Sequence, residues 1–200
     1  MHTPKTLLEL AGAPRLLADW KHAALLLIDP QMEYVTGGLP LNGIQAATNE
    51  CLALLQLARK ARAPVFHIVH HGRAGGALFD PSGRFVAIIP ELAPVEGETQ
   101  VAKSLPNGFA GTALHELIQA TGRKQLVIGG FATHMCVSAT ARAALDHGYA
   151  STVVAAACAT RDLANTDGGV VPAAVVHAAT LAALADRFAT VVPSAAVWSH

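Results

Sequence analysis

Short, continuous runs of apolar residues recur along the chain and are separated by polar or glycine-containing turns. A run that is apolar at every position, rather than at alternate positions, predicts a strand covered on both faces, as in a parallel sheet. The predicted strands cover residues 23–29, 65–71, 100–103, 125–132, 151–159 and 189–193. These runs are too short to cross a bilayer, so we expect no membrane-spanning segment.

The segments between the strands repeat apolar residues every three or four positions, which is the period of an amphipathic helix. The predicted helices cover residues 44–62, 110–121, 137–147 and 172–187. Gly122 and Gly148 stand where C-terminal caps are expected, and Pro172 stands in the first turn of the last helix. The alternation predicts one α/β domain over residues 1–200. We expect a three-layer, doubly wound, six-stranded and mostly parallel sheet of order 3-2-1-4-5-6, flanked by helices.

One connection, residues 72–97, is long for a compact domain. It is rich in glycine and contains Pro81, Pro90 and Pro94. Connections of this length often carry function. We expect this one to act either as a lid over a site or as an arm in a subunit interface.

Charge is balanced and scarce: 14 basic residues stand against 14 acidic ones in a chain of 200. A net charge of zero provides no field that would attract nucleic acid or an anionic membrane, and neither is expected as a partner. Hydrophobic residues make up 52% of the chain. Part of the surface is therefore expected to be covered in a homo-oligomer, either a dimer or a tetramer, and the alternative source of this composition is a large core. The first twenty residues show no secretory signal.

Three cysteines, Cys51, Cys136 and Cys158, have no paired spacing, which indicates a reducing, cytoplasmic compartment. Cys136 differs from the others because it follows a predicted strand and stands at the start of a predicted helix. Unpaired amides and the positive end of the helix dipole favour a thiolate there. The alternative is a buried cysteine that packs as a small hydrophobic residue, which is our interpretation of Cys51 and Cys158.

Two charged residues stand at the carboxyl ends of other predicted strands. Asp29 follows the first strand, and Lys103 ends the third. Because ligands bind beyond these strand ends, where the winding direction reverses, Asp29, Lys103 and Cys136 are expected to share a cleft. There Asp29 would take the thiol proton, and Lys103 would supply a neighbouring cation. The alternatives are a turn-forming or helix-capping carboxylate and a solvated surface lysine.

In three segments the chain resembles the isochorismatase-like cysteine hydrolases. They are Leu-Leu-Ile-Asp-Pro-Gln at 26–31, Ala-Lys at 102–103 and Gly-Phe-Ala-Thr-His-Met-Cys-Val-Ser-Ala-Thr-Ala-Arg at 130–142. The order and spacing of the aspartate, lysine and cysteine match those of the family. The likeness continues through Cys-Ala-Thr-Arg-Asp at 158–162 and the last predicted helix, so it covers nearly the whole domain.

The resemblance implies a six-stranded parallel sheet and a hydrolase that cleaves a C–N bond of a small amide through an acyl-enzyme. Cys136 would be the nucleophile, Asp29 the acid and base, and Lys103 the partner that stabilises the thiolate and holds the carboxylate. It also implies a cis peptide between Phe131 and Ala132. The amides of Ala132 and Cys136 would then form the oxyanion hole. We expect no cofactor.

The chain departs from the family in two places. Nicotinamidases of this superfamily bind a metal through an Asp-x-His pair and a further histidine, and no such pair stands here. His67, His70 and His71 occupy the corresponding stretch. We interpret them as a pocket wall rather than as metal ligands, and expect no metal. Ala156 stands where many relatives have an aspartate, which loosens a contact behind the triad without removing a triad member.

The substrate is expected to be a small-molecule amide, held by side chains that flank the predicted rim. These are Gln31, Tyr34, His71, Phe79, Phe109, Phe131 and His134. The alternative for the aromatic residues is packing or subunit contact, and His134 is expected to point aside from Cys136. Two other functions remain open. One is hydrolysis of a vinyl ether, which isochorismatases perform without the cysteine, and the other is thiol sensing or binding without catalysis.

Overall fold

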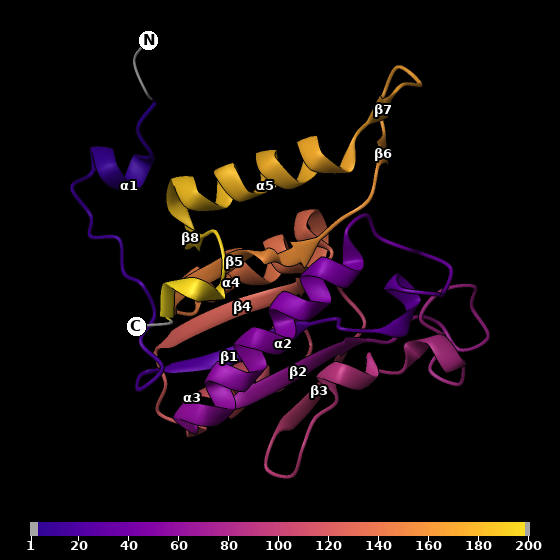
Figure 1. Cartoon of the computed structure of the whole chain (residues 1–200), viewed down its shortest axis with the longest axis horizontal. Helices are drawn as coiled ribbons and strands as arrows, with labels where there is room; N and C mark the ends of the chain where they lie inside the picture. The colour runs from indigo at the N-terminus through magenta and orange to yellow at the C-terminus, as the bar shows by residue number, and fades with distance from the viewer. Residues whose placement is uncertain (1–3, 199–200) are drawn as a thin grey trace.

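Six parallel strands form a central sheet in the computed structural model, which describes residues 4–198. In chain order they are β1 (Ala23–Ile28), β2 (Val65–His70), β3 (Thr99–Lys103), β4 (Gln125–Phe131), β5 (Ala150–Ala159) and β8 (Thr190–Val192). They lie side by side in the order β3-β2-β1-β4-β5-β8 (Figure 1). Because β8 is the sixth strand of this sheet along the chain, the predicted order is confirmed, and each neighbouring pair is parallel.

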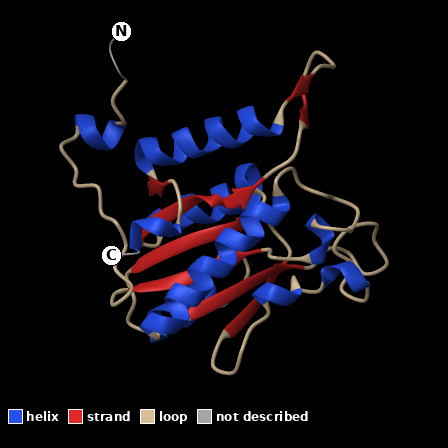
Figure 2. Cartoon of the chain, in the orientation of Figure 1, coloured by secondary structure: helices blue, strands red, loops and turns tan. Residues whose placement is uncertain are grey.

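Helices cover both faces of the sheet and complete three layers (Figure 2). The longer helices are α2 (Ile44–Ala61), α3 (Leu114–Ala120), α4 (Ser138–Asp146) and α5 (Ala173–Arg187). α2 lies in front of the sheet in Figure 1, and its buried side chains join one core cluster. α3, α4 and α5 contribute to a second cluster on the opposite face. The three-layer α/β class predicted from the hydrophobic pattern is therefore confirmed.

The central strand β1 explains why its sequence is apolar at every position. All six of its residues are buried. Because strand side chains alternate between faces, Leu25 and Leu27 pack in the cluster beneath α2, while Leu26 and Ile28 pack in the opposite one. Full burial of each such side chain contributes about 1.5–3 kcal/mol to folding. A polar residue at any of these positions would remove the burial free energy of one side chain from the core on that face.

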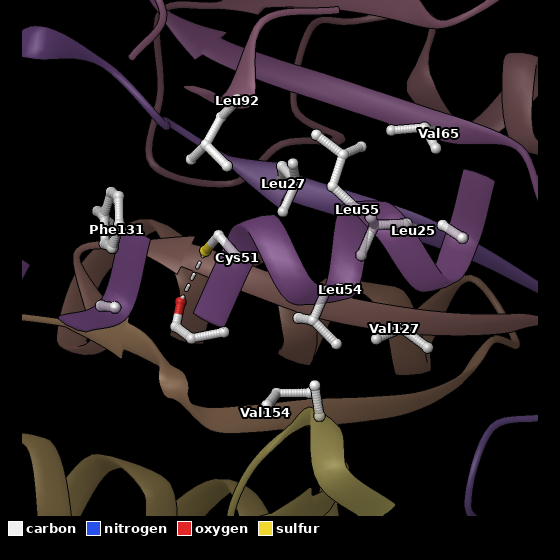
Figure 3. Packing of buried hydrophobic residues seen from close by; sticks show 14 of the residues in the cluster. Leu25, Leu27, Cys51, Leu54, Leu55, Val65, Leu92, Val127, Phe131 and Val154 are labelled. Atoms are coloured by element: carbon white, nitrogen blue, oxygen red, sulfur yellow. Dashed lines mark hydrogen bonds between the residues drawn. The ribbon is translucent and has the colours of Figure 1, made fainter. Parts of the chain in front are cut away.

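The α2 side of the core is shown in Figure 3. The buried stripe of α2 includes Cys51, Leu54 and Leu55, which lie over β1 and β4. The Cys51 thiol donates to the carbonyl oxygen of Ala157 in β5 at 3.2 Å. Cys51 is thus a core residue, as predicted.

Small elements that the pattern does not predict include α1 (Leu7–Leu10), β6 (Leu163–Ala164) and β7 (Val170–Val171). α1 is a single turn closed by a capping box between Thr6 and Glu9. The strands β6 and β7 pair as an antiparallel hairpin that projects from the domain at the upper right of Figure 1. Such short elements contain too few residues to show a hydrophobic period, so the pattern could not reveal them.

Two predicted helices begin at other residues. The predicted helix 110–121 starts only at Leu114, because Gly111 adopts a φ of +68° and the Thr112 hydroxyl donates to the Gly108 carbonyl. The predicted helix 137–147 is preceded by a π-helical turn, Thr133–Val137, before α4 begins. Cys136 therefore lies inside a wide helical turn rather than at the first turn of an α-helix.

The long connection 72–97 runs from the carboxyl end of β2 back to the amino end of β3, and its middle part lies against the loop that follows β1. It contains two short 3₁₀ turns, Arg84–Val86 and Pro90–Leu92. Backbone hydrogen bonds join Met32 N to Ala87 O (2.9 Å) and Ile89 N to Pro30 O (2.8 Å). The role of this connection as a lid or as an interface arm stays a prediction. Within residues 4–198, no helix has the length and apolar character needed to span a membrane.

Candidate active site

Three reactive side chains meet at the carboxyl ends of β1 and β3 and in the turn after β4. Lys103, the last residue of β3, donates through Nζ to Asp29 Oδ2 at 2.8 Å and to Cys136 Sγ at 3.4 Å. Asp29 directly follows β1, and Cys136 lies in the π-helical turn after β4. The residues Asp29, Lys103 and Cys136 are 0%, 3% and 3% exposed. The cluster therefore operates almost without water, where charges interact strongly.

A glycine permits β4 to come close enough to β1 for this contact. Gly130 has a φ of +129°, and a Cβ atom there would lie 2.1 Å from the Ile28 carbonyl oxygen. No L side chain fits such a gap without moving a strand. Asp29 has a φ of +48°, in the left-handed region that costs a non-glycine residue free energy. Its amide donates to Ile68 O at 2.8 Å, which holds the strained turn in place.

Burial governs the protonation of the thiol and the carboxyl. It raises the pKa of Cys136 to about 12, and the Asp29 charge adds to that shift while Lys103 opposes it. The expectation of a thiolate favoured by a helix N-terminus is therefore wrong, because the thiol is buried beside a carboxylate. Burial also raises the pKa of Asp29, against the opposing effect of Lys103. Asp29 Oδ1 is buried and has no hydrogen-bond partner among residues 4–198, so it is available to accept a proton.

His70, predicted only as part of a pocket wall with His67 and His71, is a fourth member of the cluster. Its Nδ1 lies 3.3 Å from Lys103 Nζ. Burial, and then the Lys103 charge, lower the pKa of His70 to about 4, so the ring is neutral near pH 7. His70 pairs with Lys103 in the parallel register of β2 and β3. Residues in register on neighbouring strands project to the same face, and this register is the signal that could have identified His70.

The turn that carries Cys136 is tied to β5 and α5 by side-chain hydrogen bonds. The Phe131–Ala132 peptide is cis, as the resemblance implied. Thr133 Oγ1 lies 2.9 Å from His177 Nδ1, and His134 Nδ1 lies 2.6 Å from Thr160 Oγ1. His134 thus points toward the end of β5 and not toward the thiol, as predicted. The Ala132 amide donates no hydrogen bond within the described residues.

Several side chains predicted for the pocket surround the cluster. Gln31 is buried, and its amide accepts from His70 N and donates to His70 O and Val86 O. Tyr34 packs edge-on against Phe79 and Phe131 at ring distances of 5.2 and 6.0 Å. The Phe79 ring also meets the His70 ring, 5.0 Å away. Through Gln31 and Phe79 this group of side chains contacts His70, the neighbour of Lys103.

Two residues predicted for the pocket differ from the expectation. Phe109 lies elsewhere in the fold, and His71 meets the cluster through its backbone. Phe109 packs against His147 and Tyr149 at 4.7 and 6.0 Å, in the core beside α4. Phe109 is therefore a core packing residue and not part of the expected pocket. His71 follows β2, and its backbone amide donates to Lys103 O at 2.8 Å. Its neighbour His70, and not His71, has its ring against Lys103.

The comparison with known families decides the classification of this site. A model of the Isochorismatase domain matches residues 23–196, which include all of the sheet and the whole cluster. The chain belongs to the isochorismatase family. This confirms the resemblance carried by the three sequence segments.

Similar proteins extend the comparison. The crystal structure of an isochorismatase from Pseudomonas putida KT2440 is 44% identical, with a TM-score of 0.92 over 97% of this chain and 99% of its own. The secreted isochorismatase effector Isc1 of Verticillium dahliae is 37% identical over 92% of this chain and 94% of its own. An isochorismatase family protein of Bacillus subtilis, YddQ, is 41% identical over 84% and 94%. Members of the family are hydrolases, and some are amidohydrolases, such as maleamate amidohydrolase. With a secreted protein among the relatives, the cytoplasmic location stays a prediction.

The histidines of β2 differ in their environments. His67 is fully buried, and its Nε2 lies 2.9 Å from Glu98 Oε2, which also accepts from Arg59 at 2.9 Å. His70 bonds to Lys103, as described above. No group of three or more histidine, cysteine or carboxylate side chains suited to a metal is found among residues 4–198. Ala156, which stands where many relatives have an aspartate, is exposed. None of the hydrogen bonds that the triad residues make within residues 4–198 involves it.

Proposed function

We propose that this isochorismatase-family hydrolase is an amidohydrolase that cleaves a C–N bond of a small amide or carbamoyl compound through a thioester. The observation that carries the proposal is the convergence of Lys103 Nζ on Asp29 Oδ2 and Cys136 Sγ in a buried cluster. A thiol nucleophile, a carboxylate with a free oxygen to move the proton and a fixed cation beside both are groups that can perform acyl transfer.

In the first half of the reaction, Cys136 is the nucleophile. Because burial and Asp29 raise the pKa of its thiol to about 12, the proton leaves as the sulfur attacks, and Asp29 Oδ1 receives it. The sulfur forms a bond to the carbonyl carbon, and the carbonyl oxygen becomes an oxyanion. The Ala132 amide, which has no acceptor within the described residues, and the Cys136 amide would stabilise that charge.

In the second half, Asp29 returns the proton to the departing nitrogen, and the C–N bond breaks to leave a thioester on Cys136. Asp29 then takes a proton from water, whose oxygen attacks the thioester carbon. The acid leaves, and the sulfur regains a proton. Lys103 keeps the carboxylate and the sulfur in place through the hydrogen bonds that its Nζ donates to both.

The experiment is a screen of small amides and carbamoyl compounds for release of ammonia or amine, with wild type, Cys136→Ala and Cys136→Ser. Loss of the nucleophile is expected to lower kcat/KM roughly a thousandfold or more. Cys158→Ala is the matched control, since Cys158 is also buried and free but lies outside the cluster. It is expected to keep its activity.

Other outcomes would select the alternative functions. Turnover of an enol ether that survives Cys136→Ala and is lost in Asp29→Asn would replace the proposal with vinyl-ether hydrolysis. Oxidation of Cys136 without turnover of any amide would replace it with thiol sensing. In a mass-spectrometric labelling experiment with limiting iodoacetamide, the proposal expects Cys136 to be alkylated before Cys51 and Cys158.

A further inference from the structure

The ammonium of Lys103 has three N–H groups and three acceptors. Besides Asp29 Oδ2 and Cys136 Sγ, the third is His70 Nδ1, at 3.3 Å. Because a lysine ammonium has no acceptor, the imidazole must accept at Nδ1, and a neutral imidazole then carries its proton on Nε2. The contact with Lys103 therefore selects one tautomer of His70.

The other nitrogen of His70 is accessible. His70 is only partly buried, its Nε2 has no hydrogen-bond partner among residues 4–198, and that atom is not one of the buried polar atoms left without a partner. Nδ1 and Nε2 lie on opposite sides of an imidazole ring. With Nδ1 directed at Lys103, the Nε2–H group is directed away from the triad, to the side that solvent reaches.

The backbone of His70 is held by the Gln31 side chain, and its ring is held by Phe79. The Gln31 amide oxygen accepts from His70 N at 2.7 Å, and its nitrogen donates to His70 O at 3.0 Å. The Phe79 ring stands at 81° to the imidazole with its centroid 5.0 Å away. A surface histidine would not need such support. The ring is therefore preorganised, with one nitrogen on Lys103 and the other on the open side.

We propose that His70 is a positioning residue for Lys103 and, through its Nε2–H group, the donor that selects substrates with an oxygen acceptor beside the scissile amide. The acceptor would be a carbonyl or carboxylate oxygen of the substrate. The selection of substrates rests on the proposed amidohydrolase function. The positioning of Lys103 by His70 does not depend on turnover. The groups that face the ring are the Lys103 ammonium and the neighbouring His71.

Three substitutions separate the two roles, since the side chains of Asn and Gln place polar atoms near the Nδ1 and Nε2 positions of histidine respectively. His70→Asn keeps an acceptor toward Lys103 and loses the outward donor. His70→Gln keeps an outward amide and loses the inner acceptor. His70→Ala loses both. His22→Asn is the control, because His22 is an exposed histidine that pairs with Asp19 at the surface, away from the triad.

The first measurement is the rate at which iodoacetamide alkylates Cys136 as a function of pH, followed by mass spectrometry. Lys103 lowers the pKa of the Cys136 thiol, so release of Lys103 is expected to shift the alkylation profile of His70→Gln and His70→Ala to higher pH. His70→Asn and His22→Asn are expected to follow wild type. An unshifted profile in His70→Gln and His70→Ala would overturn the positioning role.

The second measurement is the steady-state kinetics of whichever amide the screen finds. His70→Asn is expected to raise KM about ten- to hundredfold at nearly constant kcat, the loss associated with one hydrogen bond to a charged or strongly polar group. An unchanged KM for an oxygen-bearing substrate would overturn the selecting role. Alkylation of Cys136 needs no turnover, so the pH profiles test the positioning role of His70 alone. Failure of the amidohydrolase proposal would appear in the amide screen with Cys136→Ala.

Discussion

At the scale of single residues, Lys103 determines the state of each group around it. Its ammonium is the counter-charge that permits a buried carboxylate at Asp29, and its third N–H group selects the His70 tautomer. Asp29 and Lys103 are both fully buried at the side chain. Removing one member of such a pair leaves an uncompensated charge in a site that excludes water.

Lys103→Met is therefore expected to destabilise the fold by about 3–5 kcal/mol at neutral pH, measured by urea unfolding. Lys103 lowers the pKa of Asp29, so its loss raises that pKa further. A carboxyl whose folded pKa exceeds its unfolded value stabilises the fold below that pKa and loses this effect as pH rises. The penalty is thus expected to shrink as pH falls.

The control for Lys103→Met is the double variant Asp29→Asn/Lys103→Met, which has no buried charge at this position. It is expected to be more stable than Lys103→Met alone at neutral pH. Equal stability of the two variants at every pH would contradict the uncompensated charge as the cause.

The reactive residues could be located from the sequence because Asp29 and Lys103 stand at the carboxyl ends of predicted strands and Cys136 stands in the turn that follows another. The sequence could not show which of the two adjacent histidines lies beside them. His70 and His71 are adjacent, and successive strand residues project to opposite faces. Which of the two faces Lys103 depends on the register of β2 against β3, which no residue pattern within β2 reveals. The raised pKa of Cys136 likewise depends on burial created by distant segments.

At the scale of elements, the active site depends on the close approach of β1 and β4. The hydrophobic runs predicted both strands, but their spacing is set by one backbone position. Gly130 brings β4 against Ile28, and the chain then enters the π-helical turn that carries Cys136. A π-helical turn has no distinct hydrophobic signature, so the pattern predicts the helix from residue 137 and misses the turn Thr133–Val137 before it.

Gly130→Ala is expected to lower stability by about 2–4 kcal/mol, because its φ of +129° and the 2.1 Å contact with Ile28 O both penalise a Cβ atom. It is also expected to lower amide turnover by separating Cys136 from Asp29. The measurements are the urea midpoint and kcat/KM.

Gly148→Ala is the matched control for Gly130→Ala. Gly148 also has a positive φ, +80°, but a Cβ atom there meets nothing within 4 Å. Its cost is expected to be about 1 kcal/mol, from the backbone conformation alone, with activity unchanged. If the two substitutions had equal effects on stability and turnover, the contact between β1 and β4 would not be the cause.

At the scale of the whole molecule, topology was the most predictable property. Continuous apolar strands alternating with helices leave few ways to bury both faces of a sheet, and the observed strand order is the one expected. The homo-oligomer inferred from the scarcity of charge remains a prediction. Exposed apolar side chains such as Val170 and Val175, 66% and 54% exposed, are compatible with it.

Acid stability is another property of the whole fold, and it depends on an ion pair at the opposite end of the sheet. Glu98 accepts from Arg59 of α2 at 2.7 Å and lies 2.9 Å from His67 of β2. Hydrogen bonds from Arg59, Val95 and His67 outweigh the effect of burial and lower the pKa of Glu98 to about 2. A carboxyl with a depressed folded pKa stabilises the fold above its unfolded pKa, and this contribution disappears as pH falls toward the folded one.

Glu98→Gln is therefore expected to destabilise the protein by on the order of 1–3 kcal/mol at pH 7, the range for hydrogen bonds to a charged group. The difference from wild type is expected to decrease as pH falls from about 4.5 toward 2, measured by urea unfolding at a series of pH values. Glu96→Gln makes the same change at an exposed neighbouring position and is expected to have little effect at any pH. A difference between wild type and Glu98→Gln that stays constant with pH would mean that Glu98 stabilises the junction of α2, β2 and β3 through packing rather than through its charge.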